Sequence, residues 1–178
     1  MLTMLLGRYF GDRFGQKSKA ELAYFLRFYL SIGMELFGDH RMAYWLMKSE
    51  PGSWSWDDQV RDGIAEWDGV RNFQAANNMK TMKRNDKAFF YHSVNEKRIV
   101  GIVSITKEYY PDPTDPSDRF GMVDVKAVRP FKNPVTLAKI KSEPQLQNLA
   151  LVRQSRLSVL PVEDDEWKLI CAMGGTKP

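Results

Sequence analysis

The sequence predicts an α+β domain in which five or so strands alternate with short helices and curl into a small barrel. Three observations lead to this prediction. Apolar residues make up 43% of the 178 residues, which is enough for a substantial core. Short apolar runs of strand type recur along the chain, with turn-forming residues between them. Segments between those runs carry apolar residues at helical spacing.

The first 41 residues have a pattern of their own. Leu22, Phe25, Tyr29 and Ile32 recur at helical spacing, which predicts an amphipathic helix over residues 18–37. Charged residues interrupt its apolar run, so neither a membrane span nor a secretory signal is predicted. Two interpretations stay open. Met42 is the natural start and the preceding residues extend the reading frame, or the helix packs on the domain or pairs with a second copy in a homodimer.

The first half of the domain begins with a buried strand at residues 44–47. Ser55, followed three residues later by Asp58, is typical of a helix start, and we expect that helix to end near Gly63. Apolar residues at helical spacing predict a second helix over residues 72–82. After a polar turn, residues 88–92 read as the next strand.

In the second half, strands are predicted at residues 99–109, 122–128 and 156–160. A loop rich in proline and aspartate separates the first two. Short helices are expected after residues 134–136 and after residues 143–144. A closing helix is predicted at residues 163–173, with acidic residues in its first turn, where the helix dipole favours them.

Composition limits the function classes but does not choose among them. The net charge of +4 suits a polyanionic partner, although many cytosolic enzymes have a similar balance. The single cysteine, Cys171, excludes a disulfide within one chain and a cysteine-based zinc site. Two histidines are too few for a histidine metal cluster. We therefore expect no metal and no cofactor, and a cytoplasmic location.

Five short stretches are distinctive when taken in order: Lys48-Ser49-Glu50-Pro51, Trp67-Asp68-Gly69-Val70-Arg71-Asn72, Phe90-Tyr91-His92-Ser93, Pro111-Asp112-Pro113-Thr114 and Arg153-Gln154-Ser155-Arg156-Leu157-Ser158-Val159. In this order and spacing they resemble the EVE-domain family of the PUA-like superfamily, close to bacterial relatives of the thymocyte nuclear protein. The resemblance covers roughly residues 43–173. It divides the chain into an N-terminal extension, residues 1–41, which has no counterpart in the family, and an EVE domain, residues 42–174.

The resemblance implies a PUA-like mixed β pseudo-barrel with short flanking helices. The same fold occurs in YTH domains, which read methylated adenine in RNA. It also implies a pocket for a modified base, with modified cytosine in DNA favoured. A base taken out of its stack needs a flat apolar face, groups that hydrogen-bond its edge, and cations for the adjacent phosphates.

Trp67, Arg71 and Asn72 are the first candidate site residues. Trp67 precedes a turn and is the candidate stacking platform; the alternative is a core tryptophan. Arg71 has a rigid fork that grips a phosphate or a base edge. Asn72 offers a donor and an acceptor to a base edge. Its alternative role is to cap the following helix, and both roles are compatible.

Lys48 and Ser49 end the first strand, because Pro51 prevents further pairing. By resemblance, Lys48 contacts a phosphate or a carbonyl oxygen and Ser49 bonds the base; the alternative for Lys48 is a solvated surface residue. By resemblance too, the pocket wall includes three residues at the end of the third motif, namely Tyr91, His92 and Ser93. For His92 a structural role is the alternative.

Arg156 and Ser158 are expected on one face of a strand, two residues apart. There Arg156 meets a phosphate or forms a salt bridge to the barrel.

Together these residues predict a non-catalytic module that binds a flipped, modified nucleobase in DNA or RNA. No residue is assigned a catalytic role in this hypothesis. The alternative is a hydrolase of modified nucleosides or nucleobases, in which Lys48 and Glu50 activate water. A third hypothesis is a scaffold that dimerises through the N-terminal helix.

Overall fold

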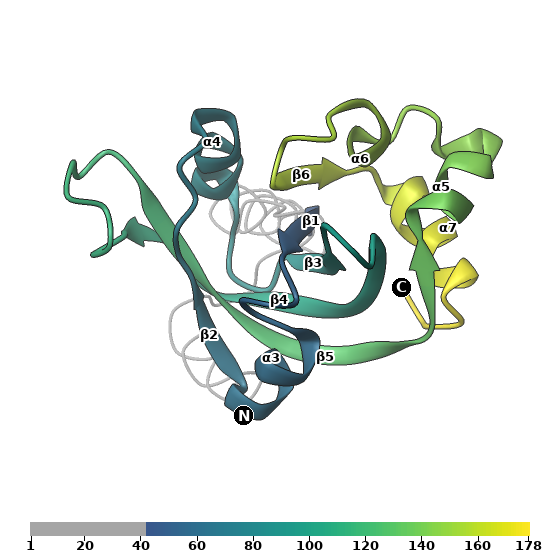
Figure 1. Ribbon diagram of the computed structural model, residues 1–178, viewed down its shortest axis with the longest axis horizontal. Coiled ribbons are helices and arrows are strands. Elements are labelled where there is room, and N and C mark those ends of the chain that lie inside the picture. Colours follow the sequence, from purple (N-terminus) through teal and green to yellow (C-terminus); the bar gives the residue numbers. More distant parts are fainter. Residues whose placement is uncertain (1–41) are drawn as a thin grey trace, which may run out of the picture. The chain divides into compact units, whose positions relative to one another are not determined.

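Residues 42–178 are described by a computed structural model (Figure 1). They form a six-stranded mixed sheet in the order β2-β5-β4-β3-β1-β6, accompanied by short helices. This confirms the predicted α+β class. The predicted helix at residues 18–37 and the homodimer built on it lie outside the described residues.

The strands are β1 Tyr44–Ser49, β2 Ile64–Trp67, β3 Lys87–His92, β4 Arg98–Pro111, β5 Gly121–Thr136 and β6 Val159–Val162. The helices are α3 Trp56–Asp62, α4 Phe73–Thr81, α5 Leu137–Ser142, the 3-10 turn η1 Pro144–Leu146, α6 Ala150–Arg153 and α7 Asp164–Met173.

Helix starts follow the sequence signals closely. The Ser55 side chain accepts from the Asp58 N–H, and the Asp58 carboxylate accepts from the Ser55 N–H, so the predicted capping box of α3 is confirmed. The Asn72 Oδ1 accepts from the Ala75 N–H at 3.0 Å and caps α4. The side chain of Asn72 is therefore fixed in direction before any ligand arrives.

Two strand predictions need correction. β5 continues well past residue 128, because Pro130 lies where the β4–β5 register shifts and its missing N–H breaks no regular ladder there. β6 begins at Val159, so Arg156 and Ser158 do not share a strand face as predicted. Residues 154–157 instead form a turn that is closed by the Leu157 N–H and the Gln154 carbonyl.

A stack of three rings holds α7 against the sheet. The Trp167 ring lies between Tyr44 and Phe89, with ring centroids 4.4 Å and 4.0 Å away, respectively. On the neighbouring residue of β1, the Trp45 Nε1–H donates to the buried Asp86 carboxylate at 3.1 Å. These contacts fasten β1 and β3 to α7 and to the turn before β3. Within residues 42–178, no helix has the length and hydropathy needed to cross a membrane.

The pairing of β1 with β3 decides where the functional side chains meet. The two strands are parallel, in a register that places Lys48 beside Tyr91 and Ser49 beside His92. Every other neighbouring pair in the sheet is antiparallel. The C-terminal ends of β1 and β3 therefore open at the same edge, and two of the sequence motifs converge there.

Candidate nucleic-acid interface

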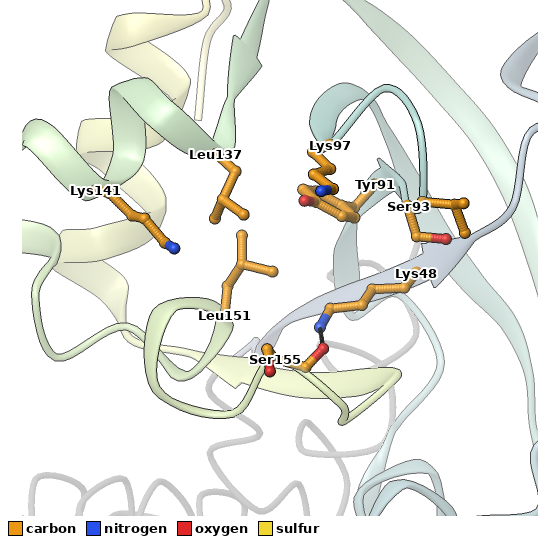
Figure 2. Close-up of a pocket in the computed structure, with 9 residues that line it drawn as sticks. Lys48, Tyr91, Ser93, Lys97, Leu137, Lys141, Leu151 and Ser155 are labelled. Atoms are coloured by element: carbon orange, nitrogen blue, oxygen red, sulfur yellow. Dashed lines mark hydrogen bonds between the residues drawn. The ribbon is translucent and has the colours of Figure 1, made fainter.

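A pocket of about 300 Å³ lies at the C-terminal ends of β1 and β3, and we call it the strand-end pocket. Figure 2 shows Leu137 and Leu151 on one side of it, and Tyr91 and Lys48 on the other. The helices α5 and α6 thus supply one wall, and the two parallel strands supply the opposite wall. Its lining residues are Lys48, Tyr91, Ser93, Val94, Lys97, Leu137, Lys141, Leu151 and Ser155.

Two polar groups of this pocket are partly withdrawn from water. The Lys48 ammonium donates to the Ser155 carbonyl at 2.9 Å, and burial lowers its pKa below the usual range. Tyr91 is 3% exposed, and burial raises the pKa of its hydroxyl to about 12. No residue between 42 and 178 hydrogen-bonds that hydroxyl, so it remains a neutral donor for a ligand.

The lining of the strand-end pocket is positively charged. Three lysines, Lys48, Lys97 and Lys141, contribute to it, and no carboxylate does. Each of the ion pairs found among the described residues involves other cations. The charge of the three pocket lysines is thus not neutralised by an ion pair within residues 42–178, which favours an anionic or electron-rich ligand.

A second pocket, of about 400 Å³, adjoins the first through Ser155, which lines both. We call it the arginine pocket, because Arg153 and Arg156 contribute its charge. Its lining residues are Asn72, Gln74, Arg153, Gln154, Ser155, Arg156 and Leu157. The Gln74 amide donates to the Gln154 Oε1 at 3.2 Å, so α4 and the turn before β6 meet across this pocket.

Five of the predicted site residues line these pockets. Lys48, Tyr91 and Ser93 line the strand-end pocket, while Asn72 and Arg156 line the arginine pocket. The structure therefore brings four of the five sequence motifs to two adjoining hollows. The other five predicted residues, Ser49, Trp67, Arg71, His92 and Ser158, line neither.

Ser49 and His92 fasten the segment between β1 and α3. The Ser49 hydroxyl donates to the Trp54 carbonyl at 2.5 Å. The His92 Nε2 accepts from the Trp56 N–H at 3.0 Å, and its Nδ1 lies 2.6 Å from the Glu96 carboxylate. Because Nε2 accepts, Nδ1 carries the proton, and the hydrogen bond it makes lowers the pKa of Glu96. This matches the structural alternative for His92.

Arg71 is engaged with the aspartate-rich loop. Its guanidinium donates to the Asp112 carboxylate and to the Thr114 hydroxyl, both at 2.7 Å. Burial alone would raise the pKa of Asp112, but hydrogen bonds from Thr114, Arg71 and the Gly69 N–H lower it to about 2. Arg71 thus holds the turn after β2 against this loop.

Trp67 and Ser158 make structural contacts in the core and the sheet. Trp67 is 8% exposed, and its ring packs edge to face against Phe90 with centroids 5.5 Å apart, as the alternative of a core tryptophan expects. The Ser158 carbonyl accepts from the Lys48 N–H at 2.9 Å. It extends the pairing of β1 and β6 up to the edge of the strand-end pocket.

Several pocket residues have no sequence signal of their own. Lys97 and Leu137 meet because the Leu137 N–H donates to the Lys97 carbonyl at 2.7 Å, although the two residues are far apart in sequence. Lys141 lies in the last turn of α5, where a lysine is ordinary. By contrast, a distinctive sequence motif includes Arg153, Gln154 and Ser155. That motif could have identified these three as site residues. Among residues 42–178, no group of three side chains suited to a metal ion occurs.

The EVE domain family model matches residues 43–173, and the chain belongs to the EVE-domain family. The mouse thymocyte nuclear protein 1 is 37% identical, over 79% of this chain and 77% of that protein. A solved structure of Rpa0253 from Rhodopseudomonas palustris is 57% identical, with a TM-score of 0.72, over 75% of this chain and 94% of that one. The human THYN1 protein, solved in complex with 5-methylcytosine-containing DNA, is 34% identical with a TM-score of 0.70, over 76% of this chain and 99% of that one.

A more distant likeness concerns the fold alone. The YTH domain of Zygosaccharomyces rouxii MRB1 is 18% identical, with a TM-score of 0.50, over 79% of this chain and 90% of that one. This likeness, together with the EVE-domain relatives, confirms the predicted PUA-like fold.

Proposed function

We propose that this protein is a non-catalytic module that binds nucleic acid and holds one modified base, turned out of its stack, in the strand-end pocket. Modified cytosine is the favoured base. The main observation is a hollow of nucleobase scale with apolar walls, lined by three lysines and by Tyr91, whose hydroxyl has no hydrogen-bond partner within the described residues. The complex of the human THYN1 protein with 5-methylcytosine-containing DNA supports this assignment.

Each part of the pocket has a role in holding such a base. Leu137 and Leu151 provide apolar surface for one face of the ring and for an added methyl group (Figure 2). Lys48 and Tyr91 donate to the oxygen and nitrogen acceptors of the base edge. Lys97 lies on the hairpin at the mouth, where it meets a phosphate of the bound strand.

Flipping a base costs a few kcal/mol, so the pocket must return a comparable amount. Burial of the ring against leucine side chains contributes about 25 cal/mol per Å² of apolar surface. Hydrogen bonds to charged donors add about 1.5–3 kcal/mol each. One such bond from Lys48 and one buried ring face are enough to offset extrusion, and no covalent chemistry is needed for retention.

The test is a titration of short oligonucleotides that differ only at one base. Fluorescence anisotropy is measured at fixed salt for matched strands carrying cytosine, 5-methylcytosine, adenine or N6-methyladenine, in DNA and in RNA. We expect the strand with modified cytosine to bind most tightly. Equal, weak and fully salt-sensitive binding to every strand contradicts the proposal, because such binding needs no pocket.

The hydrolase alternative requires Lys48 and Glu50 to act together on water. Burial lowers the pKa of Lys48, which favours a reactive amine. Within residues 42–178, however, no hydrogen bond or ion pair joins it to Glu50, and its ammonium faces the Ser155 carbonyl instead. Incubation with a panel of modified nucleosides tests the alternative. Turnover that disappears in Lys48→Ala would establish a hydrolase, whereas the proposed function predicts no turnover of any nucleoside.

A further inference from the structure

The arginine pocket offers hydrogen-bond donors in addition to those that hold one flipped base in the strand-end pocket. Arg153 and Arg156 are exposed, and neither forms an ion pair with another described residue. The Asn72 Oδ1 is occupied by the N–H of Ala75, so its amide nitrogen is left as a donor. Two arginines and an asparagine amide nitrogen, all with donors that no described residue occupies, therefore line one hollow.

The glutamine pair adds little acceptor capacity to this pocket. Gln74 and Gln154 are joined by one hydrogen bond between their amides. Whichever amide donates in that bond, the pair leaves one NH₂ group and one oxygen for a ligand. With Asn72 and the two arginines included, donors clearly outnumber acceptors. The pocket thus suits a ligand edge that presents adjacent acceptors.

The position of the pocket indicates which part of a strand reaches it. It shares Ser155 with the strand-end pocket, so the two hollows lie next to each other at that residue. Its volume of about 400 Å³ leaves room for a base as well as a phosphate. A nucleotide next to the flipped one is the part of the strand that lies within this reach.

Guanine presents a close match to such a donor-rich hollow. Its N7 and O6 atoms are two adjacent acceptors, and a guanidinium fork pairs with both at once. Adenine replaces one of these acceptors by a donor, and thymine and cytosine lack the N7 acceptor. We infer that the arginine pocket reads a guanine adjacent to the modified base, so that the protein recognises two consecutive nucleotides. This inference rests on the proposed function.

The experiment uses the full chain and single-stranded DNA probes with one central 5-methylcytosine. The neighbour on its 5′ side and the neighbour on its 3′ side are each varied among the four bases and 7-deazaguanine, and affinities are measured by anisotropy. On one of the two sides we expect guanine to bind at least about fivefold more tightly than the other bases. 7-Deazaguanine should lose this advantage, because it lacks the N7 acceptor.

Two arginine variants separate base reading from phosphate contact. Arg156→Lys keeps the charge but removes the fork, so the guanine preference should shrink toward equal binding of all neighbours. Arg153→Lys tests the other fork in the same way. Arg61→Lys is the matched control, because Arg61 pairs with Asp58 on α3 and lines neither pocket.

The outcomes distinguish this inference from the function on which it rests. Equal affinity for all neighbours, with methylated cytosine still preferred over cytosine, overturns the guanine inference and leaves the proposed function in place. It would mean that the arginines contact phosphates only. Loss of any preference for the methylated strand, whatever its neighbours, contradicts the proposed function itself.

Discussion

At the scale of single residues, the hydroxyl of Tyr91 allows a clean test, because its ring and its hydroxyl have separate roles. The ring is 3% exposed, whereas the hydroxyl has no hydrogen-bond partner among residues 42–178. Tyr91→Phe should leave the free energy of unfolding nearly unchanged and weaken binding of the methylated strand by about 2- to 13-fold, the loss of one hydrogen bond worth ~0.5–1.5 kcal/mol. Urea unfolding and anisotropy together check both halves, and unchanged affinity would place the hydroxyl outside the site.

Lys48 gives a prediction about pH. Burial lowers the pKa of its ammonium, so this charge is lost, as pH rises, before that of an exposed lysine. Affinity for the methylated strand should therefore begin to fall on the alkaline side while Tyr91, with a pKa of about 12, is still neutral. Lys48→Arg keeps its charge over that range and should remove this fall. An alkaline decline of the same size in Lys48→Arg would assign it to other groups.

Some residues of the site could be predicted from the element that they end, since Lys48 ends a strand and Asn72 caps a helix. Tyr91 and Ser93 were predicted instead from the resemblance of their motif to the EVE-domain family. Lys141 and Leu151 reach the strand-end pocket from helices that pack across a long connection, and no local pattern encodes that contact. Trp67 shows the converse: a turn beside it suggested exposure, but tertiary packing placed its ring against Phe90.

At the scale of secondary structure, Gly101 on β4 leaves space for the ring of Trp56, the first residue of α3. A side chain at this position would overlap the Trp56 ring, which lies directly against the strand. Gly101→Ala should therefore destabilise the fold by about 1–3 kcal/mol, the usual effect of overpacking a filled core. Chemical denaturation measures this loss.

A second substitution distinguishes overpacking from a change in strand propensity. In the Gly101→Ala background, Trp56→Leu removes the ring that the new methyl group meets, so the two losses should be less than additive. Strict additivity would show that the methyl group and the ring do not meet. Because the Trp56 N–H also bonds His92, the same contact holds the start of α3 against the end of β3.

Element prediction succeeded where local signals agree and failed where the partner strand decides. The capping groups of α3 and α4 fixed those starts from the sequence alone. The four-residue β2 has no clear alternation and becomes a strand only by pairing with β5. Likewise, β6 starts at Val159 because its pairing with β1 begins opposite Met47, which its own sequence does not reveal.

At the scale of the whole molecule, the distribution of charge predicts a limited salt dependence. Five cations line the two pockets, three in the strand-end pocket and two in the arginine pocket. For a single strand, each neutralised phosphate contributes about −0.7 to the slope of log affinity against log salt, so the slope should be no steeper than about −3.5. Titrations between low and moderate salt measure it, and a much steeper slope would indicate an extended binding surface beyond these pockets.

The N-terminal extension gives the last prediction, which concerns assembly. Leu22, Phe25, Tyr29 and Ile32 form an apolar stripe in the sequence, and such a stripe favours a partner surface, here a second copy of the chain. We expect light scattering to give a dimer mass for the full-length chain and a monomer mass for residues 42–178. The full-length variant Phe25→Asp should shift the mass toward monomer while leaving the affinity for the methylated strand unchanged, because the site residues all lie in the EVE domain. Identical monomer masses for both chains would exclude this assembly and leave the extension without a role in it.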